Sequence, residues 1–270
     1  MIFSIPSYKI QLNIYRFLCY NKNMDSVFIN HLKDLSQKAD RNNRYTFTGF
    51  LTEEEQSELF LIKKEVLPFT LFGGAPGCQR VIARFGDANE LGYEEDFPIA
   101  CLFAKPTLKK FSDELTHRDF LGALMHLGIE RSRTGDIVLR ENAAYLFVHT
   151  SLALYISENL TKVKHTVITC TPAPTLPEGA LFQLADETLI VSSLRLDCLI
   201  AALYKLSRAA CCELFQSKKI FINGRLCENT SYTPKSGDTV SVRGFGRFIF
   251  QGETGRTKKD RLCVKIQRYL

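Results

Sequence analysis

The 270-residue sequence contains no tryptophan, no Cys-x-x-Cys pair and no long uninterrupted apolar run. Its nine cysteines are scattered and odd in number, which argues against a zinc site and is typical of reduced thiols packed as small hydrophobes. The N-terminal segment is apolar in places, but polar residues such as Lys9 and Arg16 interrupt it, so neither a membrane span nor a signal peptide fits. We therefore expect a cytoplasmic protein without a metal ion, a cofactor or a membrane partner.

Two strings look catalytic but lack the residues that catalysis would need. The glycine-rich stretch 72–77 is followed by Cys78-Gln79 instead of the Gly-Lys-Ser/Thr of a phosphate-binding loop, so it reads as a turn. His117-Arg118-Asp119 matches a protein-kinase triplet, but no Asp-Phe-Gly and no upstream glycine loop accompany it. We expect a structural role instead, in which Asp119 favours the dipole of a helix and His117 helps to cap that helix. No catalytic residue is predicted.

The first two thirds of the chain predict an α+β protein. We expect residues 1–23 to be a poorly ordered tail or an extension upstream of the true initiator Met24, followed by an N-terminal α+β region at 24–95. There, 25–39 has the spacing of an amphipathic helix. Thr52 and Glu55 form a capping box for a second helix running towards Val66.

Residues 96–180 predict a ferredoxin-like unit. Strands and helices alternate in the order β-α-β-β-α-β, which many proteins that bind single-stranded RNA also use. The elements are expected at 99–103, 118–127 (ended by Gly128), 136–139, 144–148 (after a turn at Glu141-Asn142), 151–160 and 163–170. Base-stacking aromatics would lie exposed on such a sheet, but we expect Phe103, Tyr145 and Phe147 to be buried core instead.

The C-terminal region, 181–270, changes from helical to strand periodicity. Apolar residues recur at steps of three and four before and after Ser207, which is an expected N-cap of the second of two short helices. Asn223-Gly224 then predicts a tight hairpin, and Ser236-Gly237-Asp238 predicts a turn before the strand 239–242. Two helices, a small bent sheet and a C-terminal β-hairpin are expected.

The basic residues of the chain are concentrated in the same region. Residues 192–270 hold 15 lysines and arginines against 6 acids, a net charge of +9. Because the whole chain carries +6, residues 1–191 carry −3. Such asymmetry points to a polyanionic partner. A solvated basic surface is the plain alternative, but the interleaved glycines, aromatics and arginines of 243–248 favour RNA.

The residues of this region resemble the S4-like RNA-binding domain. The matching elements are Arg195-Leu196-Asp197, Ser207-Arg208-Ala209-Ala210, the hairpin 220–224 and the strand motif 237–242. The family usually has glycine two residues before the hairpin, where this chain has Lys218. Residues 115–137, the Phe-Gly-Gly at 72–74 and the terminal strings SVRGFGRF and KKDRLCV further resemble the YlmH-type family, which is bacterial and RNA-binding and ends in an S4-like domain.

That resemblance implies a binder of rRNA and tRNA on the large ribosomal subunit, acting in the rescue of stalled peptidyl-tRNA complexes. We expect it to be non-catalytic and, by default, monomeric. The residues expected to contact or shape the RNA-binding surface are Arg195, Lys205, Ser207, Arg208, Lys218, Lys219, Asn223, Arg243, Arg247, Lys258, Lys259 and Arg261. For Arg208, an ion pair with Asp197 or Glu213 is an alternative role.

Two other functions remain open. S4-like domains also accompany pseudouridine synthases and RNA methyltransferases, although neither a dedicated catalytic aspartate nor a cofactor loop is evident in the sequence. The YlmH-type genes often lie near cell-division genes, so an interaction protein of cell division, with RNA binding secondary, is the third hypothesis.

Overall fold

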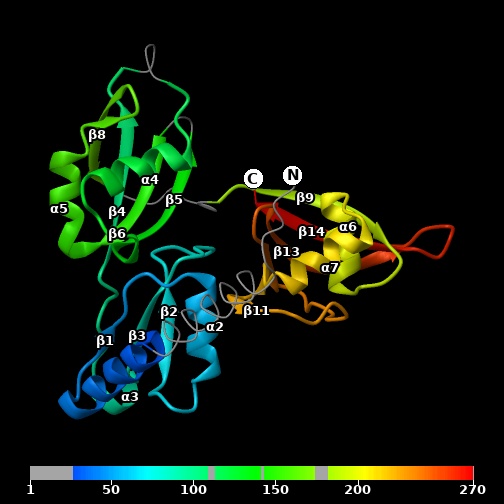
Figure 1. Ribbon diagram of the computed structural model, residues 1–270, viewed down its shortest axis with the longest axis horizontal. Coiled ribbons are helices and arrows are strands. Elements are labelled where there is room, and N and C mark those ends of the chain that lie inside the picture. The colour runs from blue at the N-terminus through cyan, green and yellow to red at the C-terminus, as the bar shows by residue number, and fades with distance from the viewer. Residues whose placement is uncertain (1–26, 109–112, 141–142, 174–181, 270) are drawn as a thin grey trace, which may run out of the picture. The chain divides into compact units, whose positions relative to one another are not determined.

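A computed structural model describes residues 27–108, 113–140, 143–173 and 182–269 (Figure 1). The expected tail at 1–23 and the turn at Glu141-Asn142 lie outside these residues. The chain forms two compact units. The first comprises the described residues up to Thr48 with 58–70 and 83–96, and the second comprises 49–57, 71–82 and the described residues from Phe97 onward. No helix in the described part of the chain is long and apolar enough to cross a membrane.

The N-terminal region is built on a helix over residues 27–42 and a three-stranded sheet of order β1-β3-β2. Its strands are β1 (Thr46–Phe47), β2 (Phe69–Phe72) and β3 (Ile82–Phe85), with the short helix α3 (Ala88–Leu91) after the last. The first helix is the one expected at 25–39. Just before β3, the backbone amides of Gln79 and Arg80 donate to a carboxylate instead of a neighbouring strand.

Helix α2 (Glu53–Leu61) starts at the predicted capping box. The Glu55 carboxylate accepts from the Thr52 amide at 2.6 Å, and the Thr52 hydroxyl accepts from the Glu55 amide at 3.3 Å. The expected extension to Val66 is wrong, since the helix ends at Leu61. Of the next five residues only Ile62 is buried, so further helical turns would gain little packing energy.

The five-stranded sheet of the second unit confirms the element order predicted for the middle of the chain. Its elements are β4 (Ile99–Pro106), α4 (His117–His126), β5 (Thr134–Arg140), β6 (Ala143–His149), α5 (Thr150–Asn159), β7 (Lys162–Val163) and β8 (Thr166–Pro172), with sheet order β5-β6-β4-β8-β7. The strand expected at 163–170 is two strands, because Lys164 takes a positive φ of 57° and turns the chain.

Helices α4 and α5 pack on one face of this sheet (Figure 1). Their Phe120, Leu124 and Ile156 join a core of alternate strand residues that includes Leu102 and Leu146. Strand residues between these core positions point to the opposite face, which we call the open face.

The aromatic residues of the sheet differ in their burial. Phe147 is buried as expected, but burial is a wrong prediction for Phe103 and Tyr145. Both are half-buried and lie outside the helix-covered core. The register explains this, since each lies next to a core residue in its strand and so points the other way.

The N-terminus of α4 is capped by Thr116 and not, as expected, with help from His117. Thr116 accepts a hydrogen bond from the Asp119 amide, and the Asp119 carboxylate accepts from the Thr116 amide, which makes a second capping box. His117 is the first helical residue, one position past the cap, so its ring is not placed to accept from the next turn. The expected placement of Asp119 in the first turn is confirmed.

The C-terminal lobe is a six-stranded antiparallel sheet with two helices. Its elements are β9 (Leu184–Val191), α6 (Leu196–Tyr204), α7 (Arg208–Gln216), β10 (Ile220–Ile222), β11 (Arg225–Leu226), β12 (Thr239–Val242), β13 (Gly246–Arg256) and β14 (Leu262–Tyr269), in the order β11-β10-β12-β13-β14-β9. The two helices and the terminal hairpin were predicted. Strand β9 was not, and it pairs with β14 over its whole length.

Replacing Thr116 by alanine removes one half of the α4 capping box. We expect Thr116→Ala to lower the free energy of unfolding by about 1 kcal/mol. Thr116→Ser should keep most of the stabilisation that the cap contributes, because a serine hydroxyl caps equally well. Urea denaturation of the full chain measures both. Thr161→Ala, at an exposed threonine outside any helix, is the control and should change the unfolding free energy by less than about 0.5 kcal/mol.

Candidate nucleic-acid interface

The turn between α6 and α7 presents three of the predicted residues. Lys205 is the C-cap of α6 and adopts the left-handed conformation, with φ of 53°. Ser207 is the N-cap of α7, as predicted, and accepts from the Ala210 amide at 3.2 Å. Arg208 is the first residue of that helix. All three side chains are exposed, so the turn carries two cations next to the positive end of a helix dipole.

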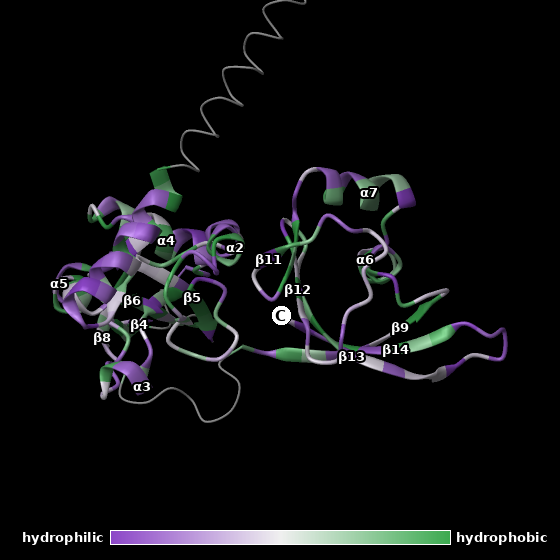
Figure 2. Cartoon of the chain, turned by 90° about the horizontal axis from the view of Figure 1, so that it is seen from below, coloured by the Kyte–Doolittle hydropathy of each residue, from purple (hydrophilic) through white to green (hydrophobic). Residues whose placement is uncertain are grey.

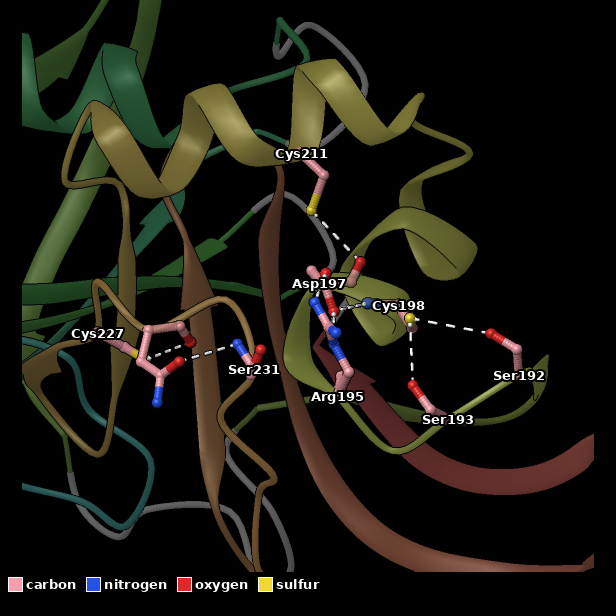
Figure 3. Close-up of polar contacts among 9 residues, drawn as sticks. Ser192, Ser193, Arg195, Asp197, Cys198, Cys211, Cys227 and Ser231 are labelled. Atoms are coloured by element: carbon pink, nitrogen blue, oxygen red, sulfur yellow. Dashed lines mark hydrogen bonds and ion pairs between the residues drawn. The ribbon is translucent and has the colours of Figure 1, made fainter.

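A buried carboxylate fixes the start of α6 (Figure 3). Asp197, only 7% exposed, accepts from the Arg195 guanidinium at 3.1 and 2.7 Å and from the Cys198 amide at 2.9 Å. The Asp197 carbonyl accepts from the Cys211 thiol of α7 at 3.4 Å. Arg195 is therefore held by an ion pair at this helix start, and Asp197 links the two helices.

The pKa of Asp197 reflects these contacts. Burial alone would raise it, but the hydrogen bonds and charge of Arg195 and the Cys198 amide outweigh burial, so the pKa lies below the ordinary aspartate value. The carboxylate is consequently ionised at neutral pH, and its partner remains Arg195. The alternative ion pair of Asp197 with Arg208 is absent from the described contacts.

The other end of α7 leads into the predicted hairpin. Lys218 takes a left-handed conformation with φ of 56°, so a lysine occupies the turn where the resembled family has glycine. Lys218 and Lys219 are both exposed. Asn223 and Gly224 have φ of 50° and 74°, which confirms the tight turn.

The side chain of Asn223 shapes this hairpin. Its amide donates to Asp238 at 2.8 Å, and its carbonyl accepts from the Thr239 amide at 2.9 Å. Asp238 also accepts from the Lys235 amide at 2.8 Å and from the Tyr232 hydroxyl at 3.3 Å. The Asp238 carboxylate thus accepts its hydrogen bonds from nearby groups of the same lobe.

Two further predicted arginines contact protein groups. Arg243 pairs with Glu54 and lies 4.9 Å from the Phe221 ring centre. Arg247 donates to the Gly77 carbonyl at 2.7 Å and lies 4.0 Å from the Tyr269 ring centre. Both side chains thus already have protein partners.

The loop joining β13 and β14 carries the remaining predicted cations. Lys258, Lys259 and Arg261 are exposed there, and Figure 2 shows the loop as a hydrophilic stretch. Arg256 pairs with Asp260 of the loop at 2.8 Å and with Glu253 of β13 at 3.6 Å, so both acids are used internally.

The predicted cations therefore fall into three groups. Lys205 and Arg208 lie at the N-terminal end of α7, and Lys218 and Lys219 lie at its C-terminal end. A third group occupies the β13–β14 loop. At 1.5 Å per residue the two ends of the nine-residue helix α7 are about 13 Å apart. Among the residues that the structure describes, no ion pair involves these four cations of α7, and its first turn holds no acid.

The sequence did not single out an aromatic pair beside the first group. Tyr204, the last residue of α6, and Phe245 have ring centres 5.3 Å apart. Phe245 is 39% exposed, and the buried Tyr204 hydroxyl has no hydrogen-bond partner in the described structure. Burial raises the pKa of Tyr204 to about 12, so the hydroxyl stays a neutral donor. The Gly-Phe-Gly string was the available signal for Phe245.

A second polar cluster joins the segments 49–57, 77–82 and 131–136. Asp136 accepts from the Gln79 amide at 2.5 Å and from the Arg80 amide at 3.2 Å. The Arg80 guanidinium donates to the carbonyls of Phe50, Arg131 and Thr134 at 2.7–3.0 Å. Burial lowers the pKa of Arg131 to about 10, which still leaves it charged at neutral pH. These contacts hold loops in place and include no activated nucleophile.

Asp197→Asn tests the buried ion pair. We expect the variant to lose about 1.5–3 kcal/mol of unfolding free energy at pH 7, the range for hydrogen bonds to charged groups. Because the folded pKa is lowered, this stabilisation exists above the unfolded value near 4 and is lost as pH falls through the folded pKa. Chemical denaturation of both proteins at several pH values should show the gap closing below about pH 4.

Asp260→Asn is the matched control, because its side chain is 81% exposed and its pair with Arg256 lies in solvent. Its cost should be below about 1 kcal/mol. A larger loss for Asp260→Asn than for Asp197→Asn would contradict the role assigned to the buried pair.

The left-handed turn at Lys218 gives a second prediction. Lys218→Gly should leave stability unchanged within about 1 kcal/mol, because relief of the positive φ offsets the extra entropy of the unfolded chain. Lys218→Val should destabilise by about 1–2 kcal/mol, since a β-branched residue is strained there. Thermal unfolding of the two variants decides, and equal stabilities would show that the turn is not constrained.

Comparison with known proteins finds proteins similar to this chain. Residues 93–176 match the family model described as a putative RNA-binding domain in YlmH. A curated relative from Bacillus subtilis (strain 168), the ribosome-associated protein quality control protein P2, is 28% identical over 90% of this chain and 95% of its own. A solved structure, the cell division protein ylmH from Streptococcus pneumoniae, is 19% identical, with a TM-score of 0.45 over 64% of this chain and 96% of that chain. The chain is thus similar to YlmH-type proteins, through the family model matched at residues 93–176 and through the curated relative aligned over 90% of its length.

Proposed function

We propose that this protein is a non-catalytic binder of structured rRNA and tRNA that acts on the large ribosomal subunit in ribosome-associated quality control. The observation that carries the proposal is the set of four exposed cations at the two ends of α7. None of them has an acidic partner in the described structure, whereas several acids of the same lobe are engaged elsewhere.

Phosphate contacts at both ends of a helix suit a folded RNA better than a small anion. The length of α7 separates the two cation pairs by about 13 Å, which is more than two nucleotides of one strand span in a duplex. The N-terminal end of α7 adds the positive end of its dipole to the charges of Lys205 and Arg208. The β13–β14 loop extends the same charge with Lys258, Lys259 and Arg261.

The finer assignments belong to the same proposal. Residues 96–180 are a ferredoxin-like domain and 181–270 an S4-like RNA-binding domain, after an N-terminal region at 24–95. Lys205, Arg208, Lys218 and Lys219 contact phosphates, while Ser207 and Asn223 shape the two turns. Arg195, Arg243 and Arg247 reach RNA only at the exposed edges of their present contacts. The curated relative's name, which places it in ribosome-associated quality control, supports the pathway and a cytoplasmic site of action.

Reversal of two cations tests the surface. We expect Arg208→Glu with Lys218→Glu to weaken binding to rRNA or tRNA by at least about tenfold, and each lost phosphate contact to reduce the salt slope by about one unit. Filter binding at several salt concentrations, with circular dichroism to confirm folding, measures both. Lys38→Glu with Lys63→Glu makes the same change in net charge at exposed lysines outside the lobe. Equal affinities for the two double variants would refute the placement of the surface.

Two experiments separate the alternatives. Incubation with rRNA and S-adenosylmethionine, followed by mass spectrometry of the nucleosides, should detect no modification; a modified nucleoside would indicate an RNA-modifying enzyme. Sucrose-gradient fractionation should show the protein migrating with large subunits at low salt. Its loss from ribosomal fractions at low and high salt alike would instead favour an interaction protein of cell division.

A further inference from the structure

The open face of the five-stranded sheet carries a feature that the C-terminal cations do not explain. Phe103 of β4 and Tyr145 of β6 lie directly opposite one another, with ring centres 4.9 Å apart and ring planes tilted by 42°. Both are half-buried and neither belongs to the core beneath the helices. Two adjacent rings on a sheet face with remaining exposed area are a surface for a flat ligand.

The register extends this pair into a row across four strands. Tyr145 pairs with Val138 of β5, and Phe103 pairs with Thr171 of β8. One row further along, Lys105 pairs with Thr169. Lys105, Thr169 and Thr171 are all exposed, so the rings are flanked by a cation and by hydroxyls that can donate and accept.

Described residues cover part of the open face, including Val138 of β5, which is 7% exposed. Phe147, one row below the rings, is 1% exposed, and a Cβ at Gly74 would lie 2.4 Å from its ring. The glycine loop therefore packs over Phe147 and needs the absence of a side chain to do so. Phe103 and Tyr145 lie beyond this cover, which is why their rings keep exposed area while Phe147 has none.

The charge of the face suits an anionic ligand. Among the described open-face positions of β4, β6 and β8 none is acidic, and Lys105 is a cation there. On β5, the nearby carboxylate of Asp136 is occupied by the amides of Gln79 and Arg80. Stacked rings, hydroxyls and positive charge together match an unpaired stretch of RNA, whose bases stack on aromatics while its phosphates meet cations.

We infer that the open face binds single-stranded RNA, with one or two bases stacked on the Phe103–Tyr145 pair and the backbone near Lys105. This inference rests on the proposed RNA-binding function but uses a different surface and a different form of RNA. The C-terminal cations take structured RNA through its phosphates, and this sheet takes unpaired bases.

The lack of tryptophan in the chain makes a direct test possible. Tyr145→Trp places a single fluorescent reporter in the full-length protein at the predicted stacking position. We expect its fluorescence to be quenched by a single-stranded RNA of about ten nucleotides and not by the same strand annealed to its complement. Unchanged fluorescence at saturating single strand, or equal quenching by the duplex, would overturn the inference.

Affinity for the same oligonucleotide supplies a second measurement. Phe103→Leu with Tyr145→Leu should weaken binding of the single strand by roughly tenfold or more, the loss expected for one stacked base. Lys105→Glu, which alters no packed side chain, should weaken it roughly threefold to tenfold. Tyr155→Leu, at a 44% exposed tyrosine of α5 on the helix side, is the matched control and should bind like the parent.

The two proposals fail separately. If the charge-reversed α7 variant loses structured RNA while Tyr145→Trp is still quenched by the single strand, both surfaces stand. If the leucine and Lys105→Glu variants, with unfolding temperatures like the parent, bind the single strand normally, the open-face site is refuted and the α7 surface is untouched. Should the leucine variants unfold, Lys105→Glu and the quenching of Tyr145→Trp decide alone.

Discussion

The C-terminal lobe depends on carboxylates that are hydrogen-bonded or ion-paired within the lobe itself. Asp197 is buried against Arg195 and bridges α6 to α7, and Asp238 holds the turn that leads into β12. Glu253 and Asp260 are taken up by Arg256. An acid bonded inside the lobe is unavailable to neutralise a surface cation. The lysines and arginines at the ends of α7 therefore present their charge to solvent, and the internal hydrogen bonds that stabilise the lobe also set its external field.

Of the five arginines predicted to bind RNA, three contact protein groups, while Arg208 and Arg261 are exposed like the predicted lysines. Arg195, Arg243 and Arg247 are each held by a carboxylate, a carbonyl or an aromatic ring, as suits a planar group with several donors. Lys205, Lys218 and Lys219 are exposed, and two of them have left-handed backbones. An ammonium on a long flexible chain gains little from a fixed protein partner but contributes fully to attraction of phosphates. The sequence could count these cations, but only the contacts separate those that build the lobe from those that face outward.

Local signals in the sequence predicted the parts of the fold that local interactions determine. The capping box at Thr52, the cap at Ser207 and the turn at Asn223-Gly224 involve residues within three positions of each other, and all three were recognised. Strand β9 was missed because its stability comes from pairing with β14, about eighty residues away, and its own sequence includes two acids. Nothing in a local pattern reports a partner at that distance.

The wrongly predicted burial of Phe103 and Tyr145 has a similar cause. Both faces of the five-stranded sheet carry apolar residues, so the composition of β4 and β6 indicated core throughout. Which face the helices cover depends on their apolar stripes and on the register, and which part of the opposite face the glycine loop covers depends on Gly74. Phe147 falls under that loop, whereas Phe103 and Tyr145 fall beyond it. The exposed area of these two rings therefore depends on how the sheet, the helices and the glycine loop assemble. It gives this sheet a chemistry that differs from that of the basic lobe.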